Sequence, residues 1–297
     1  MKNSVKAYID LTRLQFGFAW PILFCSGFFL GCAQYRCFDW VTLLKAVIIG
    51  LCGFEAGLVL NDYVDRHLDQ KDIDPTLTRY WRVFKKRPLG EEFLHPNQAL
   101  GLFFILVALT LLVIATLPHP HSLYLVLITA YCYSVEYFYQ IHKRKQKYPI
   151  AQLIGRTDFA LFPVAGYLMV GHPDITALLY FLFFYPFALA HLAVNDMVDE
   201  LNDQARRMQS ITILYGFTGS MIWITFFTII HYAMAAIFVL RQGIIASIGF
   251  AIGFIVLGIA NVGIIRRKTR QAALKALPFF HSTMLIYSVS LILDKVY

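Results

Sequence analysis

The sequence predicts an all-α integral membrane protein, built as a bundle of about nine transmembrane helices. The first observation behind this is composition: of 297 residues, 58% are hydrophobic and only 15% are charged, and the mean hydropathy is +0.60. A soluble domain of this length is rarely so apolar. The second is that the apolar residues form runs long enough to cross a hydrocarbon core of about 30 Å as helices. The third is that charged residues gather between these runs.

The apolar runs place the expected spans in order along the chain. We expect them at residues 15–34, 40–61, 98–117, 121–140, 150–171, 175–195, 215–239, 243–265 and 275–294. The first run begins too far into the chain for a signal peptide, and no small-residue cleavage site follows it. We therefore treat residues 1–297 as a single transmembrane domain.

Positive charge predicts the orientation of the bundle. With the N-terminus in the cytosol, 22 of the 26 Lys and Arg residues fall on the cytosolic side, and only Arg36, Lys45, Arg241 and Lys295 fall on the other. The positive-inside rule then selects a cytosolic N-terminus and an external C-terminus. Basic loops beside anionic lipid, or beside an anionic substrate, account for the net charge of +8. No nucleic-acid partner is expected.

Two acidic strings end apolar runs on the predicted cytosolic side. NDYVDRHLD covers residues 61–69 and NDMVDELND covers residues 195–203, and they share Asn, Asp, Val, Asp and Asp at matching places. They stand four predicted helices apart, an offset that preserves helix direction. This indicates a parallel internal repeat of two four-helix units, followed by a final helix.

The spacing within each string predicts a metal site. At about 100° per residue, the Asn and the three Asp residues of each string fall within one arc of a helix. Clustered carboxylates raise one another's pKa unless a cation intervenes, and hard oxygen ligands suit Mg²⁺, which completes its shell with water and substrate phosphate. The alternative for either string alone is a solvated helix end. The expected metal ligands are Asn61, Asp62, Asp65, Asp69, Asn195, Asp196, Asp199 and Asp203. Asp62 and Asp196 lie at the edges of their arcs, and the alternative for these two is to orient cationic residues or a water outside the metal's own ligands.

These strings resemble the two aspartate-rich motifs of the intramembrane UbiA-type prenyltransferases. The string KKRPL at residues 85–89 resembles the RPL element in the loop after the first motif of that family. LTRLQF, which contains Arg13, is similar to the first-helix region of the family, although Leu14 stands where proline is usual. YFYQIHKRK resembles the Tyr…LysArg element that follows the fourth helix. The resemblance covers essentially the whole chain.

The resemblance implies an active site at the cytosolic mouth of the bundle. There, two Mg²⁺ ions would bind the head of a polyprenyl diphosphate, and a lipophilic or aromatic acceptor would attack the allylic cation. It places Arg13, Arg66, Arg87 and Lys143 at the diphosphate, Asp65 and Asp199 in catalysis through the metal, and Tyr139 against the cation through its π face. The prenyl tail would lie between helices, with aromatic walls such as LYFLFFYPFALAHL at residues 179–192.

Other polar residues inside the expected spans have open roles. Glu55, Glu136, Arg156, Asp158 and His191 are either catalytic or satisfied interior groups. Arg156 and Asp158 are two residues apart, so they are not expected to face each other on one helix. The polar segment from Gln70 to Pro96 is expected to hold a short interfacial helix, either a lid or a plain anchor.

Two other classes of protein bear on this interpretation. A secondary transporter would carry its charges near the bilayer midplane, whereas these carboxylates gather at one end. An enzyme joining alcohols to nucleotide-activated lipid heads would carry a DG…AR…G…D…D pattern, which neither acidic string contains. Within the prenyltransferases, a quinone precursor is the favoured acceptor, and an ether-lipid glycerol or a tetrapyrrole is the alternative.

Overall fold

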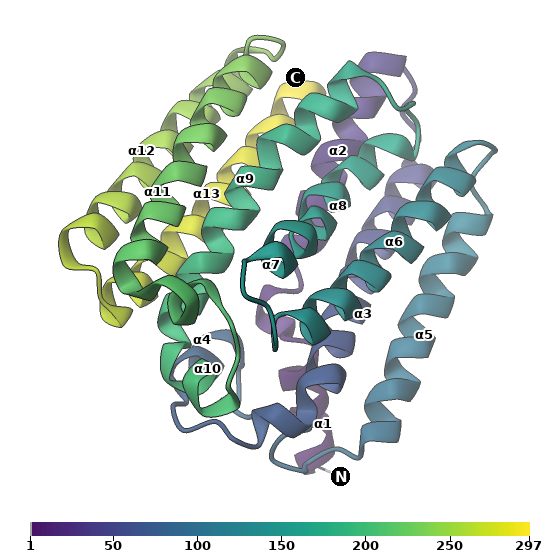
Figure 1. The fold of residues 1–297 in the computed structure, drawn as a ribbon. Helices are drawn as coiled ribbons and strands as arrows, with labels where there is room; N and C mark the ends of the chain where they lie inside the picture. Colours follow the sequence, from purple (N-terminus) through teal and green to yellow (C-terminus); the bar gives the residue numbers. More distant parts are fainter. Residues whose placement is uncertain (1) are drawn as a thin grey trace.

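The computed structural model describes residues 2–297, and all the regular structure in this range is helical (Figure 1). The helices follow one another in the order α1 (Lys2–Leu11), η1 (Leu14–Phe16), α2 (Ala19–Tyr35), α3 (Trp40–Asp69), α4 (Thr76–Trp81), α5 (Pro96–Ala115), α6 (His121–His142), α7 (Ile150–Gly155), α8 (Thr157–Leu168), α9 (Ile175–Val198), α10 (Glu200–Arg206), α11 (Ile211–Val239), α12 (Ile244–Arg267) and α13 (Arg270–Val296). The all-helical prediction is confirmed.

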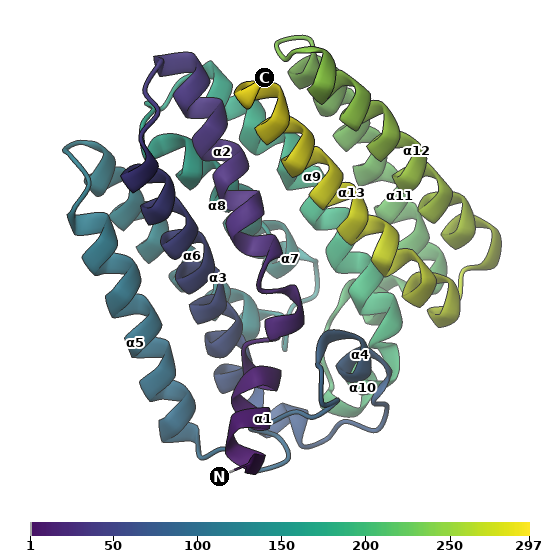
Figure 2. The same ribbon diagram turned by 180° about the vertical axis from the view of Figure 1, so that it is seen from behind.

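Helix is present in each of the nine expected spans. In residues 2–297, seven helical segments are long and apolar enough to cross a membrane: η1 with α2, and α3, α5, α9, α11, α12 and α13. The remaining expected spans coincide with α6 and with α7 and α8, which meet at Arg156. The two termini lie at opposite ends of the bundle (Figures 1 and 2).

The two halves of the chain sit side by side, and α2 and α8 pack against each other between them (Figure 1). Their backbones touch because glycines face the crossing. A Cβ added at Gly27 would lie 1.8 Å from the carbonyl oxygen of Pro163, and one added at Gly166 would lie 2.0 Å from that of Phe24. Small residues of this kind let membrane helices approach closely without a hydrophobic driving force.

The segments that lead into the two crossing helices are interrupted near the N-terminal end of the bundle. Arg13 lies between α1 and η1 with a left-handed backbone (φ 48°), and Arg156 separates α7 from α8. On the same level, α3 continues without a break to Asp69. Both interrupting residues line a cavity at this end of the bundle.

The aromatic stretch of α9 does not line that cavity. Tyr180, Phe183, Phe184 and Phe187 are fully buried and pack in the solid core of the second half, where Phe183 stacks on Phe238 and Phe250. The expectation that this stretch would form walls for a prenyl tail is therefore wrong. Of that segment, only His191 and Leu192, at its end, reach the cavity.

The segment from Gln70 to Pro96 covers the N-terminal end of the bundle and contains the expected short helix, α4 (Figure 2). One flank is held by Asn202 of α10, whose side chain accepts hydrogen bonds from the backbone N–H groups of Ile73 (2.9 Å) and Asp74 (2.8 Å). The other is held by the carboxylate of Asp10 on α1, which accepts from the N–H groups of Phe84 (2.7 Å) and Lys86 (3.0 Å). The segment is thus anchored to both halves of the chain.

Candidate active site

A cavity of about 220 Å³ lies at this end of the bundle, beneath α4. Residues from both acidic strings line it, so the repeat brings the two motifs together in space. Its wall includes Arg13, Asn61, Asp65, Asp69, Arg87, Tyr139, Lys143, Asn195, Asp196, Asp199, Asp203 and Arg206, together with aromatic rings from Trp20, Phe54, Trp81 and Phe159.

The first motif occupies the last turns of α3. Asn61, Asp65 and Asp69 are four residues apart, so successive turns bring all three to the cavity. Asp65 forms ion pairs with Lys143 (2.9 Å) and Arg144 (3.0 Å), both just beyond α6. The amide of Asn61 donates to the carboxylate of Glu136 at 2.8 Å.

Asp62 has a different place from the other carboxylates of this motif. It is 3% exposed, and its two oxygens accept hydrogen bonds from Arg13 (2.9 Å) and Arg82 (2.5 Å). Asp62 thus holds two guanidinium groups at the edge of the site. Asp62 therefore orients cationic residues, which was the alternative to a ligand role at the edge of the arc.

The second motif differs from its expected form. Helix α9 ends at Val198, and Asp199 lies at the junction with α10 (φ −90°, ψ 8°), so the four residues are not on one continuous helix. Asn195, Asp196, Asp199 and Asp203 nevertheless all line the same cavity. The bend, rather than helical periodicity alone, brings Asp203 there.

Hydrogen bonds orient the residues of the second motif. The carboxylate of Asp196 accepts from the N–H of Ile211 at the start of α11 (2.9 Å), and that of Asp199 accepts from Asn202 (2.7 Å). The side-chain oxygen of Asn195 accepts from the indole N–H of Trp81 (3.3 Å). The segment from Gln70 to Pro96, which we call the α4 segment, therefore contacts the second motif directly.

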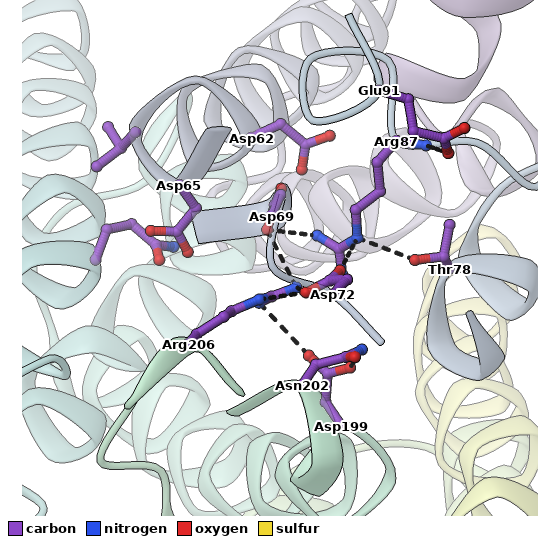
Figure 3. Close-up of polar contacts among 12 residues, drawn as sticks. Asp62, Asp65, Asp69, Asp72, Thr78, Arg87, Glu91, Asp199, Asn202 and Arg206 are labelled. Atoms are coloured by element: carbon purple, nitrogen blue, oxygen red, sulfur yellow. Dashed lines mark hydrogen bonds and ion pairs between the residues drawn. The ribbon is translucent and has the colours of Figure 1, made fainter. Parts of the chain in front are cut away.

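Two arginines join the motifs where they approach each other (Figure 3). Arg87 lies 2.8 Å from Asp69 and 2.7 Å from Asp72, and Arg206 lies 3.1 Å from Asp69 and 3.7 Å from Asp199. Arg206 also pairs with Asp72. The guanidinium groups thus neutralise carboxylates from both halves of the chain.

The pKa values of two residues show how charge is distributed between the motifs. Burial raises the pKa of Asp203 well above its ordinary value, and the nearby charges of Asp199 and Asp196 raise it further. Burial acts to lower the pKa of Arg87, but the charges of Asp69 and Asp72 outweigh it and leave the pKa raised. The second motif is thus the part of the site that most lacks positive charge.

The expected diphosphate ligands separate into two groups. Arg13, Arg87 and Lys143 line the cavity. Arg66 does not: its guanidinium turns back onto the preceding turn, where it donates to the carbonyl oxygen of Tyr63 (2.6 Å) and lies 4.4 Å from the centre of the Tyr63 ring. The guanidinium of Arg66 thus has its partners on α3 itself, and the side chain is not part of the cavity wall.

Tyr139 lines the cavity, but its ring is already in contact with cations. The ammonium of Lys143 lies 4.7 Å from the ring centre, and the guanidinium of Arg156 lies 4.9 Å from it. The ring also packs closely against Gly155, where an added Cβ would lie 2.7 Å from its edge. Tyr139 thus positions two cations beside the first motif.

The remaining polar residues of the spans have partners of different kinds. Arg156 pairs with Glu136 (3.2 Å) and, contrary to expectation, also approaches Asp158 (3.8 Å), because the helix is interrupted at Arg156. The imidazole of His191 bonds that of His281 (2.9 Å). Glu55 is 4% exposed, and within residues 2–297 neither of its carboxylate oxygens has a hydrogen-bond partner.

Several residues of the site were not expected from the sequence. Arg206 carries a weak signal, since it follows Asp203 by three residues, on the same helix face. Arg82, Trp81 and Asp72 belong to the α4 segment, and nothing in their spacing shows that this segment folds over the motifs. Asn202 occupies the position that Leu68 has in the first motif, and its amide ties α10 to the α4 segment.

The two motifs contribute carboxylate and amide oxygens to the cavity. Within residues 2–297, no three carboxylate, imidazole or thiol groups lie close enough together to hold a metal ion in this arrangement. The reason is visible in Figure 3, where cationic side chains lie between the carboxylates. The chemistry of the donors fits a hard divalent cation, provided that it displaces these cations.

Comparison with known proteins identifies related sequences and folds. The sequence profile of the UbiA prenyltransferase family matches residues 18–285. No protein of curated function matches the sequence.

Solved structures match over nearly the whole chain. A structure of digeranylgeranylglyceryl phosphate synthase is 21% identical, with a TM-score of 0.70, over 100% of this chain and 99% of that one. A UbiA homolog from Aeropyrum pernix K1 is 16% identical, with a TM-score of 0.75, over 92% and 97%. A UbiA homolog from Archaeoglobus fulgidus bound to DMAPP and Mg²⁺ is 14% identical, with a TM-score of 0.60, over 96% and 98%.

Proposed function

This chain belongs to the UbiA prenyltransferase family, and we propose that it transfers a prenyl group from a polyprenyl diphosphate to a small lipophilic acceptor in an Mg²⁺-dependent reaction. The observation that carries the proposal is the cavity itself. Carboxylates from both motifs line it, together with aromatic rings from α2, α3, α4 and α8. A donor with a charged head and an apolar tail needs both kinds of wall.

Two Mg²⁺ ions are proposed to bind between the motifs. Asp65 and Asp69 on one side, and Asp199 and Asp203 on the other, would hold them, with the amides of Asn61 and Asn195 within the same walls. The raised pKa of Asp203 supports this, because a buried carboxylate beside two others favours a bound cation. When bound, the ions neutralise the diphosphate and make it a better leaving group. Related structures bound to Mg²⁺ with DMAPP or GPP add support.

The basic residues are proposed to change partners when the donor binds. Arg87, Arg206 and Lys143 pair with motif carboxylates in this structure. Once metal neutralises those carboxylates, the same side chains are free to donate charge-assisted hydrogen bonds to diphosphate oxygens. Asp62 keeps Arg13 and Arg82 at the edge of the site, where Arg13 would add to the positive charge.

The proposed reaction breaks the bond between the allylic carbon and the diphosphate oxygen, and the electron pair leaves with the diphosphate. The acceptor supplies the electron pair of the new bond and loses a proton. We favour an aromatic, quinone-precursor acceptor, because Trp20, Phe54, Trp81 and Phe159 offer flat apolar surfaces beside the reacting carbon. Tyr139 would hold Lys143 in place as the allylic cation forms.

The protein is an integral membrane enzyme, and we propose that its cavity opens to the cytosol. Support comes from the basic loops, which lie at the same end of the bundle as α1, α4 and α10 (Figure 1). A cytosolic opening would give the site access to the water-soluble Mg²⁺ and to the charged head of the donor.

The proposal is tested with purified protein, labelled prenyl diphosphates and a lipid extract, followed by identification of the labelled product. We expect labelled aromatic product in the presence of Mg²⁺ and without any ion gradient. A labelled ether lipid or tetrapyrrole would confirm prenyl transfer but would show that the acceptor is not a quinone precursor. Gradient-dependent movement of an ion with no labelled product would instead identify a transporter.

A further inference from the structure

His191 on α9 is a polar residue of the cavity wall that the proposed reaction leaves without a role. It precedes Asn195 of the second motif by four residues, which corresponds to about 6 Å at the helical rise per residue. Its imidazole therefore lies one helical turn deeper in the bundle than the motif. The hydrogen bonds around this ring determine which of its two nitrogen atoms carries a proton.

The orientation of the Asn195 amide is fixed by a partner that can only donate. The indole N–H of Trp81 lies 3.3 Å from the side-chain oxygen of Asn195. The amide nitrogen of Asn195 therefore faces His191, where it donates to the carbonyl oxygen at 3.1 Å and lies 3.3 Å from Nε2 of the imidazole. Because an amide nitrogen cannot accept a hydrogen bond, Nε2 of His191 is an acceptor and carries no proton.

A second imidazole agrees with this assignment. Nε2 of His191 also lies 2.9 Å from Nε2 of His281 on α13, so His281 donates to it. The other nitrogen of His281, Nδ1, lies 2.7 Å from the hydroxyl of Tyr80 in the α4 segment. Both nitrogens of His281 thus have partners that hold its ring in place. An imidazole without a proton on Nε2 carries one on Nδ1, so His191 presents Nδ1 as a hydrogen-bond donor.

This donor faces the cavity. No hydrogen bond joins Nδ1 of His191 to another group of residues 2–297, and Nδ1 is not among the buried polar atoms that lack a partner. The atom is therefore accessible, and the cavity is the space that His191 borders. A protonated ring nitrogen has no lone pair for a metal ion. What Nδ1 can bind in the cavity is an oxygen atom of a ligand.

We propose that His191 recognises the prenyl acceptor, by donating a hydrogen bond from Nδ1 to an oxygen atom on the acceptor's ring. This rests on the proposed function, in which the diphosphate lies between the motifs, one helical turn away from His191. The prenyl chain has no polar atom that could accept the bond. The acceptor is thus an aromatic molecule with a hydroxyl or carbonyl oxygen, and it would lie against Trp20 and Trp81 in the same wall.

The other members of the hydrogen-bond network are positioning residues. Asn195 and His281 keep Nε2 of His191 without a proton, so the proton stays on the side of the cavity. Trp81 and Tyr80 of the α4 segment orient these two residues in turn. The segment that covers the cavity therefore also sets the direction of the bond that His191 offers.

Equilibrium binding of two matched probes tests the proposal without turnover. Naphthol and methylnaphthalene, substituted at the same carbon, have nearly the same size, but only naphthol has an oxygen atom. Their Kd values are measured on the full chain with Mg²⁺ and geranyl thiolodiphosphate, a donor analogue that does not react. Quenching of tryptophan fluorescence reports the binding, since Trp20 and Trp81 line the cavity. The ratio of the two Kd values is compared between variants.

Two substitutions at His191 separate recognition from a structural role. His191→Gln places an amide near the position of Nε2, so it retains contact with His281 and Asn195 but removes the donor at Nδ1. We expect the preference for naphthol to fall roughly fivefold, which is the contribution of one neutral hydrogen bond. His191→Asn places its amide near Nδ1 and should retain most of the preference. A purely structural histidine would give the opposite order, because only glutamine retains the contacts of Nε2.

His142→Gln is the matched control, at an exposed histidine of α6 outside the cavity wall, and it should leave the ratio unchanged. The opposite order of the two His191 variants, or an unchanged ratio in His191→Gln, would overturn the inference. Weaker binding of geranyl thiolodiphosphate to His191→Gln would also overturn it, because His191 would then contact the donor. Failure of the proposed function is distinguishable, because the unmodified protein would then not bind geranyl thiolodiphosphate.

Discussion

Arg206 of α10 lies 3.1 Å from the carboxylate of Asp69 at the end of α3, so a side chain from one half of the chain neutralises the motif of the other. Arg206 is 5% exposed at its side chain, and it also pairs with Asp72. In this arrangement a protein cation stands between the motifs, where the proposed function places Mg²⁺.

Substitution of Arg206 should lower the stability of the protein and increase the stabilisation that Mg²⁺ provides. Arg206→Gln leaves buried carboxylates without one partner, which costs about 3 kcal/mol, at the low end for a buried pair because Arg87 still holds Asp69. The thermal midpoint of the purified protein should fall, and Mg²⁺ alone should raise it more in the variant than in the unmodified protein. Arg207→Gln, at the exposed neighbouring residue, should change neither value. Equal Mg²⁺ shifts in both proteins would remove Arg206 from the metal site.

Arg87 should contribute mainly to donor binding. Arg87→Ala removes a charge-assisted hydrogen bond worth roughly 1.5–3 kcal/mol, or about one to two decades in kcat/KM for the prenyl donor. Arg87→Lys should restore part of this, because lysine offers a point charge and not a planar fork. The control is Lys86→Ala, at an exposed residue that pairs with Glu91. If Arg87→Ala leaves kcat/KM for the prenyl donor unchanged but raises the KM of the acceptor, Arg87 lies beside the acceptor and not beside the diphosphate.

Orientation is open to direct measurement by cysteine labelling in sealed vesicles. Cysteines introduced at the exposed positions Lys147 and Gln204 should react only from the cytosolic side, and one at His172 only from the other. The native Cys37 is exposed and lies on the predicted external side, so it serves as an internal reference and is replaced by serine in the test variants. Reaction of Lys147 and His172 positions from the same side would contradict the nine-span arrangement.

An added side chain at the α2–α8 crossing should destabilise the protein. Gly27→Ala would place a methyl group 1.8 Å from the carbonyl oxygen of Pro163, so the helices must separate. Overpacking of this kind costs about 1–3 kcal/mol, measured as a lower thermal midpoint. Gly263→Ala, where the added methyl meets nothing, should be neutral or slightly stabilising. Equal behaviour of the two variants would contradict the close contact at the crossing.

The sequence predicts those parts of the fold that depend on local pattern. The helical spans follow from apolar runs, and the convergence of the motifs on one cavity follows from the repeat, because an offset of four helices returns the same residues to the same end. Interruptions are not visible in such patterns. The bend at Asp199 and the break at Arg156 have no counterpart in the apolar pattern, and the break brings Arg156 within 3.8 Å of Asp158.

Contacts between side chains on different helices could not be predicted from the sequence either. Arg66 follows Asp65 directly, yet its guanidinium bonds the carbonyl oxygen of Tyr63 and does not reach the cavity, and the sequence does not show which way this long side chain turns. Arg206 and Arg82 reach the site because α10 and the α4 segment fold against it, and no periodic pattern in the sequence predicts that placement. The aromatic stretch of α9 looked like a wall for a ligand, but it fills the core instead.

The central claim is that the two motifs act together to hold a metal–diphosphate complex, and equilibrium binding of labelled geranyl diphosphate tests it most directly. The account predicts that binding requires Mg²⁺ and is lost in excess chelator. It also predicts that Asp65→Ala and Asp199→Ala, one from each motif, each abolish binding in a protein that remains folded. Tight binding in excess chelator, or full binding after either substitution, would contradict it.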